Sequence, residues 1–196
     1  MSDALVLGFD TSAAHCAAAL LCGPRILVAR SEAMTRGQAE RLMPLLEEVL
    51  AAGGAEWTDL ARIGVGVGPG NFTGIRIGVS AARGLALALE IPSIGVTSFE
   101  VISSGEAAAH VPAVPAPRDH VYVERPGGQQ AMLTLADAQA LGPPLHYLPE
   151  PDQMACQIAR IAANALPGAP PAPLYLRTAD AAPARDAPPV MLDEHG

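Results

Sequence analysis

Two short segments of the chain carry residue types that hold phosphate groups in many α/β proteins. One is Asp10-Thr11-Ser12, after a predicted strand, and the other is the strand-to-helix loop Gly68-Pro69-Gly70-Asn71-Phe72-Thr73. A glycine-rich turn that opens a helix can bind a phosphate, because backbone N–H groups point out of it. Each segment also has a simpler interpretation, a capped turn for the first and a tight packing turn for the second. We therefore expect no more than residual nucleotide contact, through Asp10, Thr11, Ser12, Gly68, Gly70 and Thr73.

Other kinds of catalytic chemistry have little support in the sequence. The chain contains no lysine, which excludes a P-loop, a Schiff base and a kinase-type phosphate lysine. Its five histidines are scattered, with neither a histidine pair four residues apart nor a cysteine at ligand spacing. No Ser–His–Asp arrangement can be argued. We predict no catalytic residue, no metal and no cofactor.

Charge and hydropathy limit the surroundings and the partners. The formal net charge is −8, whereas tight direct binding to nucleic acid usually needs a basic face. The longest apolar run, residues 74–89, carries Arg76 and Arg83, and the first residues lack the basic start of a signal peptide. The three cysteines form no CxxC pair and are expected to be reduced thiols. These features predict a soluble, cytoplasmic chain that has no membrane partner and no tight direct contact with nucleic acid, while contact through a basic partner stays open.

Hydrophobic periodicity and turn residues divide the first hundred residues into a series of elements. Three short strands come first, and a helix with one apolar stripe follows them. A strand, a second helix, a strand and a third helix complete the series, and Thr97 and Glu100 have capping-box spacing at the start of the third helix. The predicted strands are 5–10, 15–21, 26–30, 63–67 and 94–96, and the first two helices are 38–51 and 74–89. This connectivity is that of a ribonuclease H-like lobe, the unit shared by sugar kinases, Hsp70 and actin.

The second half of the chain has a different character. Fifteen of the nineteen prolines lie at residue 112 or beyond. This half holds predicted strands at 121–124 and 131–135 and a predicted helix at 152–166, too little regular sequence to duplicate the first lobe. We therefore predict an α/β fold with a complete ribonuclease H-like first lobe, residues 1–105, and a reduced second lobe with a C-terminal tail, residues 106–196.

The predicted helix at 74–89 is apolar on almost every side. Its charged residues, Arg76, Arg83 and Glu90, are seven apart and form one narrow stripe. Such a helix must be covered on more than one side, and its own sheet covers only one. Its small residues favour close approach of another helix, so we predict a helix–helix interface, either with the apolar stripe of the helix at 38–51 or with a second chain. The alternative is that the reduced second lobe covers this face. The predicted interface residues are Leu42, Leu45, Leu46, Val49, Gly74, Ile75, Ile77, Gly78, Ala81, Ala82 and Leu85.

Taken together, the motifs of the first lobe are similar to one known family. The run GVGPGNFTGIRIGVSAARGLALAL, preceded by LGFDTS and QAERLMPLLEEVL and followed by IPSIGVTSFEVI, closely resembles the TsaB (YeaZ) family. The resemblance covers residues 6–102, and PLYLR at 173–177 is similar to the family's C-terminal ending. The chain departs from the family at Gln38, where members often carry His, and at 115–118, where Pro-Ala-Pro-Arg replaces an Asp-Ala-Arg-like run.

The resemblance implies a fold, a function and partners. TsaB-like proteins are shortened relatives of TsaD, the catalytic subunit for threonylcarbamoyladenosine (t6A) on tRNA, within the actin and Hsp70-like (ASKHA) superfamily. They pair with TsaD through the two helices of the first lobe, and TsaE, an ATPase, joins the complex. We therefore expect a noncatalytic scaffold subunit that binds a TsaD-like partner for t6A formation at position 37 of tRNA. The alternatives are an ATP-binding enzyme or M22-type peptidase of the same superfamily, and a homodimer built on the same helices.

Overall fold

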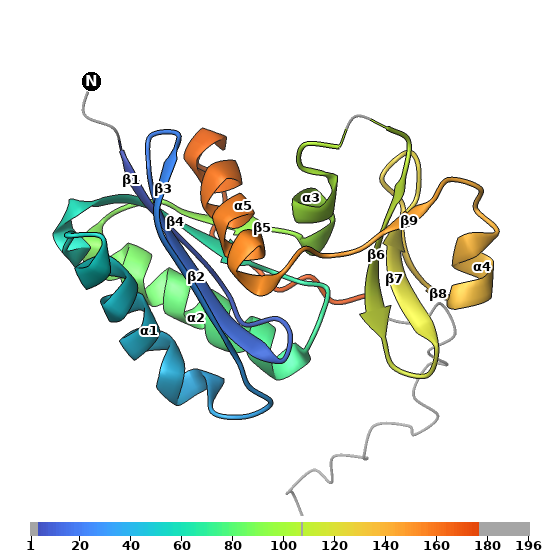
Figure 1. The fold of residues 1–196 in the computed structure, drawn as a ribbon, viewed down its shortest axis with the longest axis horizontal. Helices are drawn as coiled ribbons and strands as arrows, with labels where there is room; N and C mark the ends of the chain where they lie inside the picture. Colours follow the sequence, from blue (N-terminus) through green and yellow to red (C-terminus); the bar gives the residue numbers. More distant parts are fainter. Residues whose placement is uncertain (1–3, 107, 177–196) are drawn as a thin grey trace, which may run out of the picture.

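A computed structural model describes residues 4–106 and 108–176 of the chain. Two β-sheets stand side by side, a larger one formed by the first hundred residues and a smaller one formed by the second half (Figure 1). The first sheet carries long helices on both faces. The second carries short helices, so the molecule consists of one complete lobe and one reduced lobe, as the sequence predicts.

The first sheet has the strand order of a ribonuclease H-like fold. The order is β3-β2-β1-β4-β5, in which β2 runs antiparallel to its two neighbours while β4 and β5 run parallel to β1. The strands are β1 (Leu5–Asp10), β2 (His15–Cys22), β3 (Arg25–Ala33), β4 (Leu60–Gly66) and β5 (Ser93–Val96). All five predicted strands are therefore present, and the ASKHA-type fold class is confirmed.

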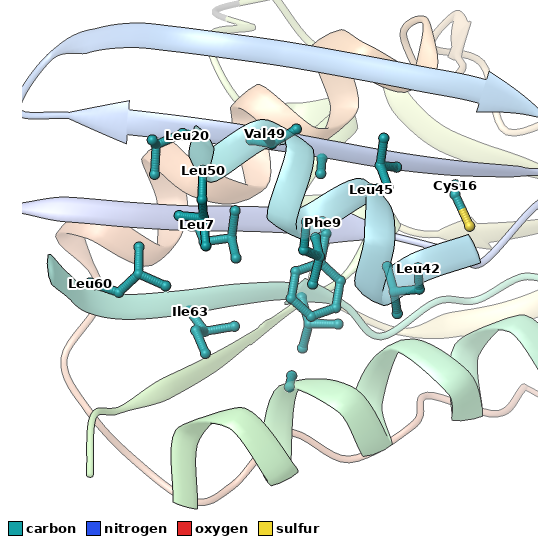
Figure 2. Close-up of a cluster of buried hydrophobic side chains, with 14 of the residues drawn as sticks. Leu7, Phe9, Cys16, Leu20, Leu42, Leu45, Val49, Leu50, Leu60 and Ile63 are labelled. Carbon is teal, nitrogen blue, oxygen red and sulfur yellow. The ribbon is translucent and has the colours of Figure 1, made fainter. Parts of the chain in front are cut away.

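Helices cover both faces of this sheet. The first two, α1 (Gln38–Ala52) and α2 (Phe72–Leu89), lie side by side on one face, and α5 (Pro151–Asn164) lies on the other (Figure 1). Side chains alternate along β1, so Leu7 and Phe9 point into the core beneath α1 and α2, whereas Val6 packs on the α5 side. Figure 2 shows Leu42, Leu45, Val49 and Leu50 of α1 lying over Leu7 and Phe9.

The second sheet is thin, and its two faces meet different helices. Its order is β8-β7-β6-β9, with β6 (Val111–Ala116), β7 (His120–Glu124), β8 (Gln130–Thr134) and β9 (Leu145–His146). On one face Val111, Ala113 and Val121 pack with α4 (Leu135–Gln139). On the other face Val114 packs with Phe99 of α3 (Ser98–Ser103), the helix between the two sheets. The capping box predicted for α3, at Thr97 and Glu100, is confirmed.

Two features of the second half differ from the prediction. Helix α5 was expected in the second lobe, yet it packs on β1, β2 and β4 of the first sheet. The reason is a close backbone approach: a Cβ at Gly8 would come within 2.6 Å of the Ala159 amide nitrogen. Strand β6 was not expected, because it lies in the proline-rich stretch. It tolerates Pro115 because β9 pairs with β6 only at Val111 and Pro112. The boundary at residue 105 itself stays a prediction.

Candidate functional site

The chain turns sharply at the end of β1, and the Asp10 side chain closes this turn. Asp10 is completely buried, and its Oδ1 accepts hydrogen bonds from the backbone N–H (2.8 Å) and the hydroxyl (2.9 Å) of Ser12. The same oxygen lies 2.8 Å from Nε2 of His15. Its second oxygen, Oδ2, lies against Gly66 of β4, where a Cβ would come within 1.8 Å of it. The carboxylate therefore serves the turn, and it leaves room only for glycine at Gly66.

The glycine-rich loop before α2 packs directly against this turn. The backbone N–H of Asn71 donates to the carbonyl oxygen of Ser12 (2.6 Å). The Thr11 hydroxyl donates to the carbonyl oxygen of Gly74 (2.7 Å). A Cβ at Gly70 would come within 2.3 Å of the Ser12 carbonyl oxygen, and one at Gly74 within 1.9 Å of the Thr11 carbonyl oxygen. These glycines therefore let two backbones approach closely.

The residues predicted for residual phosphate contact are thus brought together, except Thr73, but they bind one another. Three donors, the hydroxyls of Thr11 and Ser12 and the backbone N–H of Asn71, all donate to acceptors of the Asp10 turn or of α2, so they form a closed junction between the turn and the loop. A phosphate group would need donors that face it, and these three donors face other groups of the turn and the loop; phosphate contact at this place stays a prediction. Helix α2 begins at Phe72, two residues before its predicted start at residue 74. Its N-cap is Asn71, whose side-chain Oδ1 accepts a hydrogen bond from the backbone N–H of Gly74 (2.9 Å), while Thr73 is exposed.

Most of the predicted interface residues are buried inside this chain, which corrects the sequence-based prediction. The stripe of α1 lies against β1 and β2, and one face of α2 lies against β1 and β4. Three predicted residues, Ile77, Ala81 and Leu85, stay partly exposed. The remaining ones are buried in the folded chain, and of these only Leu42 borders the groove between the two helices: Leu42, Leu45, Leu46, Val49, Gly74, Ile75, Gly78 and Ala82.

Large apolar side chains are exposed on the outward surface of α1 and α2, among charged residues that include Glu40, Glu47, Arg76 and Arg83. Met43 is 36% exposed, Phe72 50% and Leu87 81%. Between the two helices runs a groove of about 460 Å³ with Met43, Ile77 and Ala81 in its lining and Leu42 among the residues that border it. By length and composition α2 could also cross a membrane, a test that apolar helices of soluble proteins pass as well.

Arg76 stands at the edge of this groove and is held by two aromatic rings. Its guanidinium carbon lies 3.8 Å from the centroid of the Phe72 ring, and its Nε donates to the Tyr175 hydroxyl (2.8 Å). The Phe72 and Tyr175 rings lie 4.7 Å apart. Tyr175 arrives from the segment 171–176, in which the Leu174 amide donates to the Val67 carbonyl oxygen (2.8 Å). This aromatic clamp was not predicted, because 99 residues separate Arg76 from Tyr175.

Two of the acidic residues near α1, Glu32 and Glu48, form ion pairs with arginines. Arg41 of α1 bonds both Glu32 of β3 (2.6 Å) and Glu48 (2.8 Å), and Arg30 lies 3.3 Å from Glu48. The hydrogen bonds from Arg41 hold the pKa values of Glu32 and Glu48 below their usual range. This charged network lies on the β3 side of α1, so it leaves the groove between α1 and α2 without an acidic lining residue.

Two histidines that the sequence separates meet in the second lobe. The rings of His110 and His146 stack with their centroids 4.7 Å apart, and Glu106 Oε1 lies 3.8 Å from Nδ1 of His146. Within residues 4–106 and 108–176 no three His, Cys, Asp or Glu side chains are grouped so as to hold a metal ion. We therefore interpret the stacked histidine pair as a local packing contact at the β6–β9 end of the second sheet.

Comparison with known sequences relates the chain to one family. The family model described as TsaD, tRNA N6-adenosine threonylcarbamoyltransferase, matches residues 31–143. The tRNA threonylcarbamoyladenosine biosynthesis protein TsaB of Escherichia coli K12 is 36% identical over 100 residues, 51% of this chain and 43% of that protein. The tRNA N6-adenosine threonylcarbamoyltransferase of Burkholderia thailandensis is 44% identical over 69 residues, 35% of this chain and 20% of the enzyme. The chain spans about half the length of the TsaB relatives it matches.

Solved structures agree with the sequence comparison. YeaZ from Pseudomonas aeruginosa superimposes with a TM-score of 0.67 at 25% identity, covering 88% of this chain and all of that one. A further crystal structure, described as a protein with similarity to peptidase YeaZ, gives a TM-score of 0.69 at 25% identity over 89% of this chain. The likeness therefore extends over both lobes.

Proposed function

Because the chain belongs to the TsaD family and, within it, to the TsaB (YeaZ) proteins, we propose that it is a noncatalytic subunit that binds a TsaD-like partner. The complex forms N6-threonylcarbamoyladenosine at position 37 of tRNA, in the cytoplasm. The observation that carries this proposal is the exposed apolar surface of α1 and α2, with Met43, Phe72 and Leu87 open to solvent. A surface of this kind is stabilised by burial against a second protein.

A noncatalytic role agrees with the chemistry of the first lobe. Most polar groups of the Asp10 turn and of the loop before α2 are bonded to one another, whereas the buried Asp10 Oδ2 has no hydrogen-bond partner among the described residues. A general base or a nucleophile needs a reacting atom within hydrogen-bond reach, which this closed junction does not offer. We therefore assign no catalytic residue and no cofactor to the chain, and we place the chemistry on the partner.

The partner's fold supports the choice of the α1–α2 surface. Threonylcarbamoyltransferases match the same chain in sequence, so a TsaD-like protein carries elements equivalent to those of this first lobe. Two related lobes can pair through equivalent faces, as the two subunits of an isologous dimer do. The same surface would pair two copies of this chain when the partner is missing. A TsaE-like ATPase joins through the complex, and tRNA is contacted indirectly.

Reconstitution tests the proposal. The full chain is mixed with the TsaD-like and TsaE-like proteins, tRNA, ATP and the threonylcarbamoyl donor, and t6A is measured by mass spectrometry of tRNA nucleosides. We expect t6A to form in the full mixture and not in a mixture that lacks this chain. This chain without the TsaD-like protein should form no t6A. Calorimetry with ATP and ADP on the isolated chain is the companion measurement. Micromolar nucleotide binding with turnover would overturn the noncatalytic role in favour of an ATP-binding enzyme.

A further inference from the structure

Two arginines on the outer side of α2 have no ion-pair partner, unlike the arginines that are bound within the chain. Arg30 and Arg41 are bound to glutamates, and Arg62 donates to backbone carbonyl oxygens. Arg76 and Arg83 are exposed, and neither has a carboxylate partner among the described residues. The part of this face from Arg76 to Arg83 is therefore basic, although the stripe ends in the exposed Glu90 and the chain has a net charge of −8. The charge of this part complements an acidic partner surface.

Arg76 is also held in place before any partner arrives. Its Nε is bonded to the Tyr175 hydroxyl and its plane lies on the Phe72 ring. A guanidinium has five N–H donors, so the terminal nitrogens remain for a carboxylate, which they can bind through two parallel hydrogen bonds. A side chain fixed in this way loses less conformational entropy on binding than a free arginine does.

The clamp also connects the groove to the second lobe. Phe72 lines the groove between α1 and α2, and it lines a smaller cavity of about 190 Å³ as well. The other walls of that cavity include Tyr122 of β7 and the residues Leu174 to Leu176, so it lies at the junction of the two lobes. Arg76 therefore borders the groove, and Phe72 and Tyr175, the two rings that hold it, line the smaller cavity.

We propose that the partner docks along this whole surface and brings an acidic side chain to Arg76, between one apolar side chain in the α1–α2 groove and a second in the junction cavity. This inference rests on the proposed function and names the partner chemistry that it requires. Tyr122 of β7 and the segment 171–176 then belong to the docking surface, and Tyr175 acts as a positioning residue for Arg76.

Binding measurements on point variants test this inference. The full chain is titrated with the purified TsaD-like protein, and the Kd is measured at low and high salt. Tyr175→Phe keeps the ring and removes the hydroxyl, so we expect binding about 3- to 10-fold weaker. Arg76→Lys keeps the charge and loses the planar fork, and we expect a loss of about 10-fold or more. Arg76→Glu should lose about 100-fold or more, and Leu176→Trp, which fills the junction cavity, about 10-fold.

The matched control is Arg160→Glu. It makes the same change of charge on an exposed position of α5, on the opposite face of the first sheet, and should bind like the wild type. Circular dichroism and thermal unfolding of each variant distinguish a folding defect from a binding defect. If the wild-type chain does not bind the partner, the proposed function fails and this inference with it. If the wild type binds and the Arg76 variants bind equally well, the inference alone is wrong.

Discussion

Gly78 of α2 lies directly over the hydroxyl group of Thr11, so that a Cβ built at Gly78 would come within 2.8 Å of Thr11 Oγ1. The contact shows which side of α2 faces the sheet and explains why a glycine stands in the middle of a helix. The same helix has a second interior glycine, Gly84, which is exposed and has no atom within 4 Å of an added Cβ. Gly78 is therefore required for close packing of α2 on the sheet, whereas the position of Gly84 has room for a side chain.

The first prediction uses this pair. Gly84→Ala should stabilise the chain by about 0.5–1 kcal/mol, because alanine restricts the unfolded chain and favours helix. Gly78→Ala should destabilise it by about 1–3 kcal/mol, because the added methyl group meets Thr11. Urea unfolding of both variants checks the sign. Equal effects of the two substitutions would show that α2 does not face the sheet in this way.

The second prediction concerns the end of α5. Arg62 of β4 donates to the carbonyl oxygens of Ala162 (3.2 Å) and Ala165, at the C-terminal end of that helix. Arg62→Met keeps most of the side-chain length but removes these bonds and the favourable charge at the helix end, and we expect a loss of about 1–2 kcal/mol in the free energy of unfolding. Arg160→Met, on the exposed side of α5, is the control and should change stability by no more than about 0.5 kcal/mol.

A third prediction follows from the burial of a cysteine. Burial raises the pKa of the Cys16 thiol to about 11, with Glu32 adding to the effect. At pH 8 only about one Cys16 in a thousand is then a thiolate, the form that reacts with alkylating reagents. Timed alkylation with peptide mass spectrometry should show Cys16 labelled far more slowly in the folded chain than in urea. Equal rates in the two conditions would contradict the buried position.

A fourth prediction concerns pH. Glu32 and Glu48 have lowered pKa values in the folded chain because Arg41 bonds them. Their contribution to stability is therefore present above their ordinary pKa of about 4.5 and is lost as the pH falls through the lower folded values. Arg41→Gln should lower the Tm slightly at pH 7 and change it little near pH 3, because exposed pairs contribute modestly. A Tm difference that grew toward acid pH would contradict this.

Most of the fold followed from local patterns. The alternation along β1, the 3.6-residue stripe of α1 and the Thr97–Glu100 capping box each depend on neighbouring residues, and the structure contains all three. Strand β6 was missed because proline usually excludes a strand, and whether an edge tolerates Pro115 depends on where β9 ends. The placement of α5 depends on Gly8, more than a hundred residues before it.

The candidate site was less predictable. The sequence shows that α2 is apolar all round, but Ile75 and Ile77 have the same side chain and only the fold decides which of them is buried. Glycine at Gly74 and Gly78 did signal close approach, which the structure assigns to the backbone and hydroxyl of Thr11 instead of a partner helix. The contact between Arg76 and Tyr175 has no local signal at all.

Whether a side chain is buried or exposed decides which substitutions probe the interface. Leu46 is completely buried, so Leu46→Glu would place an unpaired charge in the core and unfold the chain, with a cost of several kcal/mol. Ile77 lines the groove and is partly exposed, so Ile77→Asp alters the docking surface while the core stays intact. Tyr147, 48% exposed and carried by the second lobe, offers a matched surface control.

Size-exclusion chromatography of the co-expressed pair tests the central claim most directly. The full chain and the TsaD-like protein are purified together, and light scattering gives the mass of each peak. We predict one peak with the mass of the complex for the wild type and for Tyr147→Ala, and two separate peaks for Ile77→Asp with unchanged circular dichroism. Separate elution of the wild-type proteins, or an intact complex with Ile77→Asp, would contradict a docking surface on α1 and α2.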